Sequence, residues 1–108
     1  MWSARRRPPA TLFAALGDEN RLRLAARLCD RGPLSIARLA EGSRITRQAI
    51  SKHLRVMETS GLVCHARNGR ETVWRLNPQR LDDARQYLET ISRRWDEALL
   101  RLKHFVED

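Results

Sequence analysis

The sequence predicts a mainly α-helical domain with a small β-hairpin, arranged in the order α-α-α-α-β-β-α. Three observations predict it. Apolar residues recur every three or four positions in several segments, an Asn-Gly pair separates two alternating segments, and 108 residues suffice for a single core. We expect a flexible basic tail over residues 1–10, a core over residues 11–78 and a long helix over residues 79–108.

Three short helices are expected before residue 41. The first covers residues 11–16, and the second covers residues 19–30 with Asp18 as its N-cap. Ser35 is the expected N-cap of the third. The second helix places four apolar residues at core spacing: Leu22, Ala25, Ala26 and Cys29. The third has three inward residues: Ile36, Leu39 and Ala40.

A fourth helix and a hairpin follow. Thr46 is the expected N-cap of a helix that runs to about Ser60, and its buried stripe is Ile50, Leu54 and Met57. Strands are expected over residues 62–67 and 72–76. Between them lies Asn68-Gly69, a dipeptide typical of two-residue hairpin turns because both residues tolerate positive φ.

The last helix has apolar residues in alternating steps of three and four. They are Leu81, Ala84, Leu88, Ile91, Trp95, Ala98, Leu102 and Phe105. This heptad pattern is typical of a helix that packs along another helix. At ~1.5 Å per residue such a helix is about 43 Å long, which exceeds the reach of the short elements before it. We therefore expect a second copy of the chain to cover it.

Positive charge is concentrated in the middle of the chain. The formal net charge is +8, and residues 44–75 contribute seven basic and two acidic side chains, a net +5. On the helix after Thr46, the face opposite the buried stripe carries Arg47, Gln48, Ser51, Lys52 and Arg55. Arginine can pair with guanine and glutamine with adenine in the major groove, whereas lysine and arginine also neutralise phosphates. The N–H groups at the start of this helix, with Thr46, suit a phosphate.

The hairpin supports the same interpretation. Its tip is basic, since Arg67 and Arg70 flank Asn68 and Gly69. The expected elements follow one another as a helix, a short helix, a tight turn, a helix and a basic hairpin. This is the order of a winged helix-turn-helix domain, in which the hairpin contacts the phosphate backbone. We expect double-stranded DNA as the partner. A protein–protein adaptor on the same fold is the main alternative and RNA binding a lesser one, because A-form RNA closes its major groove to a helix.

Two segments resemble the ArsR-type family of bacterial repressors. Residues 45–54 read ITRQAISKHL and continue through Met57 to residues 60–63, SGLV, while residues 16–23 read LGDENRLR. Gly69-Arg70 at the hairpin tip and Leu76 at the end of the second strand also resemble the corresponding positions of the family. The resemblance implies a homodimer built on the first and last helices, with Leu12 and Leu16 in its interface. It also implies an inverted-repeat operator and repression by occlusion of a promoter.

The sequence departs from the metal-sensing members of this family. No cysteine occurs in the third helix, and on the last helix His104-x-x-Glu107 lacks the Asp-x-His half, because Asp82-Asp83-Ala84 has no histidine. We expect no metal and no cofactor, and the sequence indicates neither a small-molecule nor a metal effector. No catalytic set or phosphate loop is present, so we expect no enzyme activity.

The remaining expectations concern the surroundings of the chain. Cys29 is expected in the core, and neither it nor Cys64 in a disulfide. No apolar run approaches the ~20 residues that span a bilayer, and no secretory signal follows the arginines at positions 5–7. We therefore expect a cytoplasmic protein.

Overall fold

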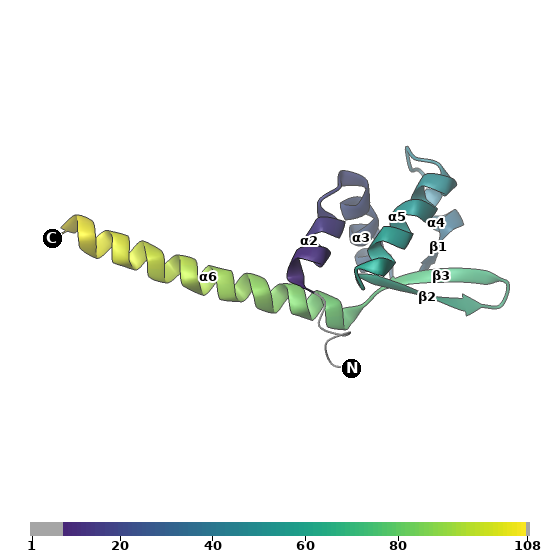
Figure 1. Ribbon diagram of the computed structural model, residues 1–108. Helices are drawn as coiled ribbons and strands as arrows, with labels where there is room; N and C mark the ends of the chain where they lie inside the picture. The colour runs from purple at the N-terminus through teal and green to yellow at the C-terminus, as the bar shows by residue number, and fades with distance from the viewer. Residues whose placement is uncertain (1–7, 108) are drawn as a thin grey trace.

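The computed structural model describes residues 8–107 and confirms a winged helix-turn-helix fold with one element that the sequence did not predict (Figure 1). The elements in chain order are α2 (Pro9–Leu16), α3 (Glu19–Arg31), β1 (Leu34–Ser35), α4 (Ile36–Ala40), α5 (Arg47–Thr59), β2 (Val63–Asn68), β3 (Glu71–Leu76) and α6 (Pro78–Glu107). Because Pro9 already begins α2, the predicted tail boundary at residue 10 is wrong. Arg5, Arg6 and Arg7 of that tail lie outside the described residues.

The three predicted N-caps are confirmed. Asp18 accepts a hydrogen bond from the Arg21 N–H at 3.0 Å, Ser35 from the Arg38 N–H at 3.2 Å and Thr46 from the Ala49 N–H at 3.1 Å. Each side chain thereby satisfies a backbone donor that has no partner inside its own helix. The starts of α3, α4 and α5 were therefore predictable from local chemistry.

The sheet has three strands, not the two of a simple hairpin. Their order is β1-β3-β2, and both neighbouring pairs are antiparallel. β1 places Leu34 opposite Trp74 and Ser35 opposite Val73. A strand of two residues is too short to show an alternating pattern, and its partner β3 lies about forty residues further along the chain, so no local signal predicts it.

The turn of the wing differs from the predicted one. Asn68 pairs with Glu71 as the last residue of β2, so Gly69 and Arg70 form the two-residue loop. Gly69 has φ +68°, and no residue other than glycine has positive φ in the part of the chain described. A turn with glycine first replaces the Asn-Gly turn, in which both central residues would need positive φ.

The core lies between α2, α3, α5 and the sheet. Ile50, Leu54 and Met57 are fully buried, which confirms the predicted stripe of α5. The predicted core face of α3 is wrong: Leu24 and Leu28 are the buried residues. The other face of α3 is exposed, with Leu22, Ala26 and Cys29 on it, whereas Ala25 packs partly against the core.

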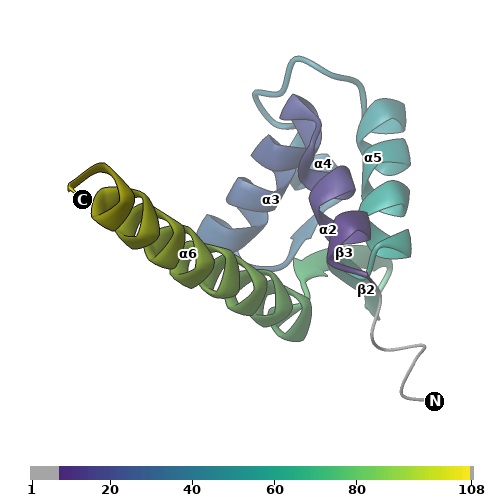
Figure 2. The same ribbon diagram turned by 60° about the vertical axis from the view of Figure 1, so that its left-hand side comes forward.

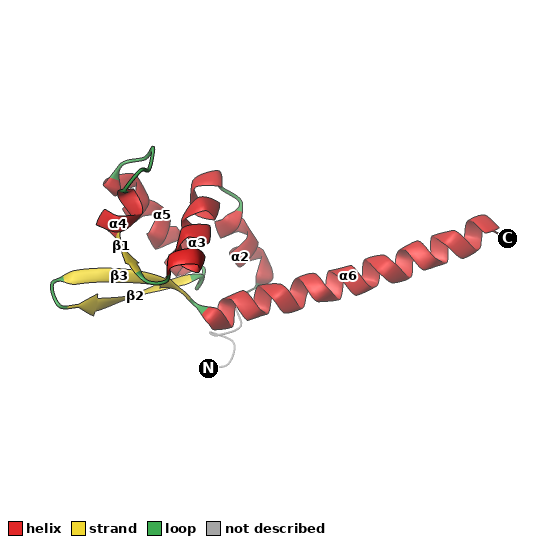
Figure 3. Ribbon diagram, turned by 180° about the vertical axis from the view of Figure 1, so that it is seen from behind, coloured by secondary structure: helices red, strands yellow, loops and turns green. Residues whose placement is uncertain are grey.

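Helix α6 gives the molecule an elongated shape. Its first turns pack on α2, where the rings of Phe13 and Tyr87 lie 5.9 Å apart, and its second half extends away from the other elements (Figures 2 and 3). The principal extents are 67 × 37 × 20 Å and the radius of gyration is 18.0 Å. A compact chain of this length has a radius of about 13 Å. One chain therefore leaves half of its longest helix without a packing partner.

Candidate nucleic-acid interface

Helix α5 is oriented by its buried stripe. Because Ile50, Leu54 and Met57 are fully buried against the core, the opposite face of the helix is turned outward. Arg47, Gln48, Lys52 and Arg55 on this face are exposed, and Ser51 is half-buried. Thr46 is exposed as well, with its hydroxyl oxygen used by the N-cap bond.

The outward side chains of α5 are not engaged elsewhere. Within residues 8–107, none of the five side chains from Arg47 to Arg55 on this face forms a hydrogen bond or ion pair with another residue. These side chains therefore take no part in holding the fold and remain available to a partner. An unpaired basic and amide-bearing face on an exposed helix is suited to the base edges and phosphates of a major groove.

The wing presents the second basic group. Arg67, Asn68, Gly69 and Arg70 are all exposed at the far end of the β2–β3 hairpin (Figure 1). His65 links the hairpin to the end of α5, since its Nδ1 lies 2.5 Å from Glu58 Oε2 and its ring lies tilted against Trp74 with the ring centroids 4.8 Å apart. This contact holds the wing at a defined position beside α5.

A second contact fixes the other side of α5. His53 Nδ1 lies 3.9 Å from Asp18 Oδ2 and 3.4 Å from Arg21 Nη1, so His53 packs against the start of α3. The Arg21 N–H that donates to Asp18 lowers the pKa of this carboxyl below its ordinary value. Partial desolvation opposes the effect, and the charges of Arg21 and His53 add to it. Asp18 is therefore ionised where it caps α3 and faces α5.

Three arginines that the sequence analysis did not assign stabilise helix ends. Arg21 donates to Ala15 O at 2.6 Å at the end of α2, and Arg27 donates to Leu39 O at 2.6 Å at the end of α4. Arg80 is buried and donates to Ser60 O at 3.0 Å, directly after α5. A cation at a helix C-terminus satisfies carbonyls without intrahelical partners and interacts favourably with the helix dipole. Part of the basic charge therefore holds the fold.

Arg80 also connects α5 to the N-terminal helix. Its Nη2 donates to Pro8 O at 3.0 Å, and its Nη1 lies 3.5 Å from Asp83 Oδ2. One buried guanidinium thus joins the start of α6 to the end of α5 and to the residue before α2, beside the contact of Tyr87 with Phe13. No local pattern marks this residue, because the acceptors Ser60 O and Pro8 O are distant from it in sequence.

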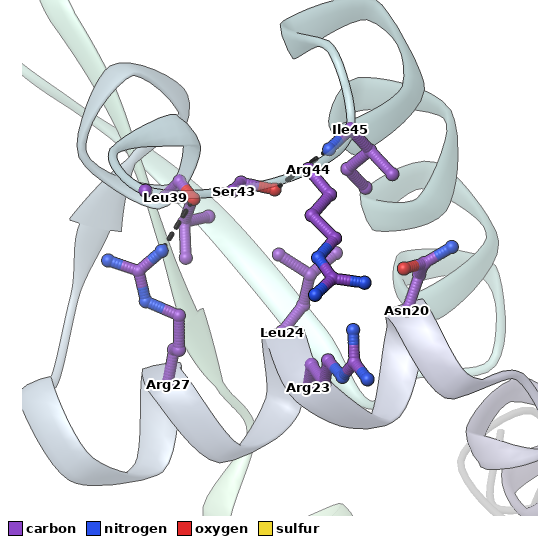
Figure 4. Close-up of a pocket in the computed structure, with 9 residues that line it drawn as sticks. Asn20, Arg23, Leu24, Arg27, Leu39, Ser43, Arg44 and Ile45 are labelled. Carbon is purple, nitrogen blue, oxygen red and sulfur yellow. Dashed lines mark hydrogen bonds between the residues drawn. The ribbon is translucent and has the colours of Figure 1, made fainter.

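A cavity of about 200 Å³ lies between α3 and the turn before α5 (Figure 4). Arg23, Arg27 and Arg44 are among its lining residues, and Figure 4 shows Arg44 pointing from the turn toward α3. Arg23 is paired with Glu19, and Arg27 is bonded to carbonyls of α4 and of the residue after it. The cavity is therefore a space left between packed helices, and Arg44 adds positive charge beside the start of α5.

The residues predicted for a dimer interface fall into two groups. Leu12 is fully buried in the core of its own chain, so its assignment to an interface is wrong, and Leu16 and Ala84 pack partly against that core. The other predicted residues lie along α6 and are exposed, except for the half-buried Ala98. The exposed set is Leu81, Leu88, Ile91, Trp95, Leu102 and Phe105.

The cysteines and the other potential metal ligands do not form a site within the described residues. Cys29 is exposed and Cys64 half-buried, so the core position predicted for Cys29 is wrong. Among residues 8–107, no three His, Cys, Asp or Glu side chains lie together in a way that could hold a metal ion. In the same range no helix has the length and apolar character needed to cross a membrane.

An exposed helix with an unpaired polar face, held by two preceding helices and flanked by a basic hairpin, defines a winged helix-turn-helix DNA-binding protein. Residues 16–64 match the model of a family described as a helix-turn-helix domain. The chain is 37% identical over 101 residues to the HTH-type transcriptional regulator Rv2034 of Mycobacterium tuberculosis, covering 94% of this chain and 91% of that protein.

Two further similarities specify the family. The structure superposes on an ArsR-like transcriptional regulator from Rhodococcus sp. RHA1 with a TM-score of 0.77 and 36% identity, over 90% of this chain and 91% of the other. The arsenical resistance operon repressor of Escherichia coli is 33% identical over 70 residues, which cover 65% of this chain and 60% of that protein. The chain belongs to the ArsR-type family of winged helix-turn-helix transcriptional regulators. It is a DNA-binding regulator and not an enzyme.

Proposed function

We propose that the protein is a repressor that binds an inverted-repeat operator in double-stranded DNA as a homodimer. The observation that carries the proposal is the outward face of α5, on which five polar side chains have no partner within residues 8–107, beside a wing with a basic tip. A helix with such a face fits the major groove, and the wing reaches the adjacent phosphates.

We assign different roles to the side chains of this interface. Arg47, Gln48 and Ser51 lie in the first turns of α5 and are assigned to base edges. Lys52 and Arg55 follow on the same face, and we assign them to phosphates. Arg67 and Arg70 of the wing are assigned to the phosphate backbone. Under this assignment the first group determines which sequence is bound, and the other two determine affinity and its salt dependence.

The homodimer is supported by apolar surface on two helices. Trp95 is 63% and Phe105 80% exposed in the single chain, on the same side of α6 as Ile91. Helix α2 has the sequence PATLFAAL, and only Leu12 and Ala15 of it are buried. Helices that are apolar beyond their buried side are normally covered by another element. A second copy would cover both, and binding to inverted half-sites one turn of DNA apart would require its α5 helix to lie about 34 Å from that of the first.

Repression follows from the position that such a dimer would take on DNA. A pair of α5 helices and two wings covers about two turns of duplex and would exclude other proteins from a promoter that contains the operator. The name of the similar Escherichia coli protein states that it is a repressor, which supports the same role here.

Selection of bound duplexes from a random pool tests the DNA-binding part of the proposal. We expect recovered sequences to contain two inverted half-sites with centres about 10 base pairs apart. A placement of the operator over a promoter should then lower transcription of a reporter gene. Recovery of unrelated sequences, at low and at moderate salt, would contradict sequence-specific binding and favour an adaptor.

The dimer is tested by a charged residue placed in the exposed apolar stripe of α6. Ile91→Asp would bury a carboxylate between two helices, so we expect a monomer by light scattering and no binding to the two-half-site duplex. Arg93→Asp, about 160° around the same helix, is the control and should remain dimeric. A dimeric Ile91→Asp protein would show that this apolar stripe of α6 is not the dimer interface.

The proposal includes no metal effector. Addition of Zn²⁺ or Ni²⁺ at stoichiometric amounts should leave the operator complex intact in an electrophoretic mobility assay, with the chelated sample as reference. Release of the DNA by either ion would contradict this expectation.

A further inference from the structure

An apolar stripe lies on the outer face of α3. Leu22, Ala26 and Cys29 are spaced i, i+4 and i+7, which places them on one face of the helix. That face points away from Leu24 and Leu28, the buried residues of α3, and Leu22 is 54% exposed. Three apolar side chains at helical spacing are typical of a packed surface, yet in the single chain they face solvent.

Helix α6 has a matching feature in its second half. Up to Trp95 its exposed apolar residues follow mainly the narrow alternation of the heptad, whereas Leu99 and Val106 widen the stripe after it and are 45% and 72% exposed. At 100° per residue these two side chains lie on one edge of the stripe, next to Trp95 and Leu102. A narrow stripe suits one partner helix, and a wide stripe suits a surface made of several helices.

The two features can meet in a two-fold dimer. If two α6 helices cross in antiparallel fashion near Ile91, residues 95–106 of one helix run beside the first turns of the other. Ile91 is 14 residues from Phe105, about 21 Å of helix, and 13 residues from Pro78, about 20 Å. Helices α2 and α3 lie on the same side of α6 (Figures 1 and 3). In such a dimer, residues 95–106 of one copy would therefore lie near α2 and α3 of the other copy.

We infer that residues 95–106 of α6 dock on α3 of a second copy of the chain, with Leu99 and Val106 against Leu22, Ala26 and Cys29. The inference rests on the proposed homodimer and adds the surface that receives the far half of α6. Helix α3 contacts α5 through Asp18, Arg21 and His53. Each α6 would therefore steady the DNA-contacting helix of the other copy.

Disulfide cross-linking tests this contact directly. In a Cys64→Ser background Cys29 is the remaining thiol of the chain, and Leu99→Cys or Val106→Cys adds a second one on the docking edge of α6. A disulfide requires Cα atoms within about 7 Å, so mild oxidation should link two chains only where the surfaces touch. We expect a covalent dimer on a non-reducing gel for at least one of the two variants. We also expect its loss when Cys29 is changed to serine.

A control variant and a measurement of the oligomeric state make the result decisive. Glu97→Cys, on the opposite face of α6, should give at least fivefold less covalent dimer. Cross-linking no stronger than this control, in a protein that light scattering shows to be dimeric, would overturn the docking on α3 and leave the proposed dimer standing. A monomeric protein would overturn the dimer and this inference together.

An affinity measurement gives an independent readout. Leu22→Gln changes an exposed side chain, so the unfolding of a single chain should be unaffected, while the dissociation constant of the dimer should rise at least tenfold. Arg23→Gln, the neighbouring exposed position on α3, is the matched control and should change it less than twofold. Equal constants for the two variants would contradict the docking.

Discussion

Helices α5 and α6 are both amphipathic, but the single chain buries the apolar side of only one of them. Ile50, Leu54 and Met57 of α5 are fully buried, whereas Trp95 and Phe105 of α6 are largely exposed. On α5 the polar face is free to meet a partner, and on α6 the apolar face is free. The difference shows that one periodicity can serve folding in one helix and, we propose, assembly in another.

The largest expected effect comes from a cavity in the stripe of α5. Leu54→Ala should lower the free energy of unfolding by about 2–5 kcal/mol, because a fully buried side chain leaves a space that its neighbours do not fill. Leu102→Ala removes the same atoms from α6 and should leave the unfolding of the diluted chain unchanged, weakening only dimer formation. Denaturant titrations at several protein concentrations separate the two. Equal losses at the lowest concentration would erase the distinction between the helices.

The junction of the two helices should give the next effect. Arg80→Met removes the guanidinium that bonds Ser60 O and Pro8 O, and loss of charged hydrogen bonds at buried carbonyls should cost about 1–3 kcal/mol of unfolding free energy. Arg85→Met, which breaks exposed ion pairs with Asp82 and Glu89, should lower the free energy of unfolding clearly less than Arg80→Met does, because solvent screens these pairs. Thermal or urea denaturation of both variants tests this order. A stable Arg80→Met protein would mean that packing alone positions α6.

The free face of α5 is compared with the wing by two alanine variants. Gln48→Ala should weaken operator binding by about 1–3 kcal/mol and relax the preference at one base pair. Arg70→Ala should weaken binding to all duplexes alike and reduce the slope of affinity against salt by about one. Binding isotherms on operator and mutated duplexes at three salt concentrations give both quantities. Identical behaviour of the two variants would contradict the division into base and phosphate contacts.

The smallest effect concerns acid stability. The folded chain lowers the pKa of Asp18, so the ionised cap stabilises the fold above the unfolded pKa of about 4, and this contribution is lost as pH falls through the lower folded pKa. Asp18→Asn keeps a capping side chain that does not titrate, and its stability should vary less with pH below about 4. Unfolding curves from pH 7 to pH 2.5 test this. A wild-type curve parallel to that of the variant would remove Asp18 as a cause.

Local signals in the sequence determined much of the fold. Asp18, Ser35 and Thr46 marked helix starts because capping depends only on neighbouring residues, and the stripe of α5 followed from its period. The outward face of α5 was predicted for the same reason, since the opposite side of a buried stripe must face out. The family could also be recognised from contiguous segments around Thr46.

Tertiary structure decided what no short segment encodes. Strand β1 exists because β3 offers it a partner, the wing turn was set by the register of β2 and β3, and Leu24 replaced Leu22 in the core because α2 and α5 approach α3 from the other side. Arg21, Arg27 and Arg80 became helix-end ligands only once distant carbonyls came within reach. A periodic pattern predicts that a helix has an apolar side. Whether the same chain covers that side depends on the arrangement of its other elements.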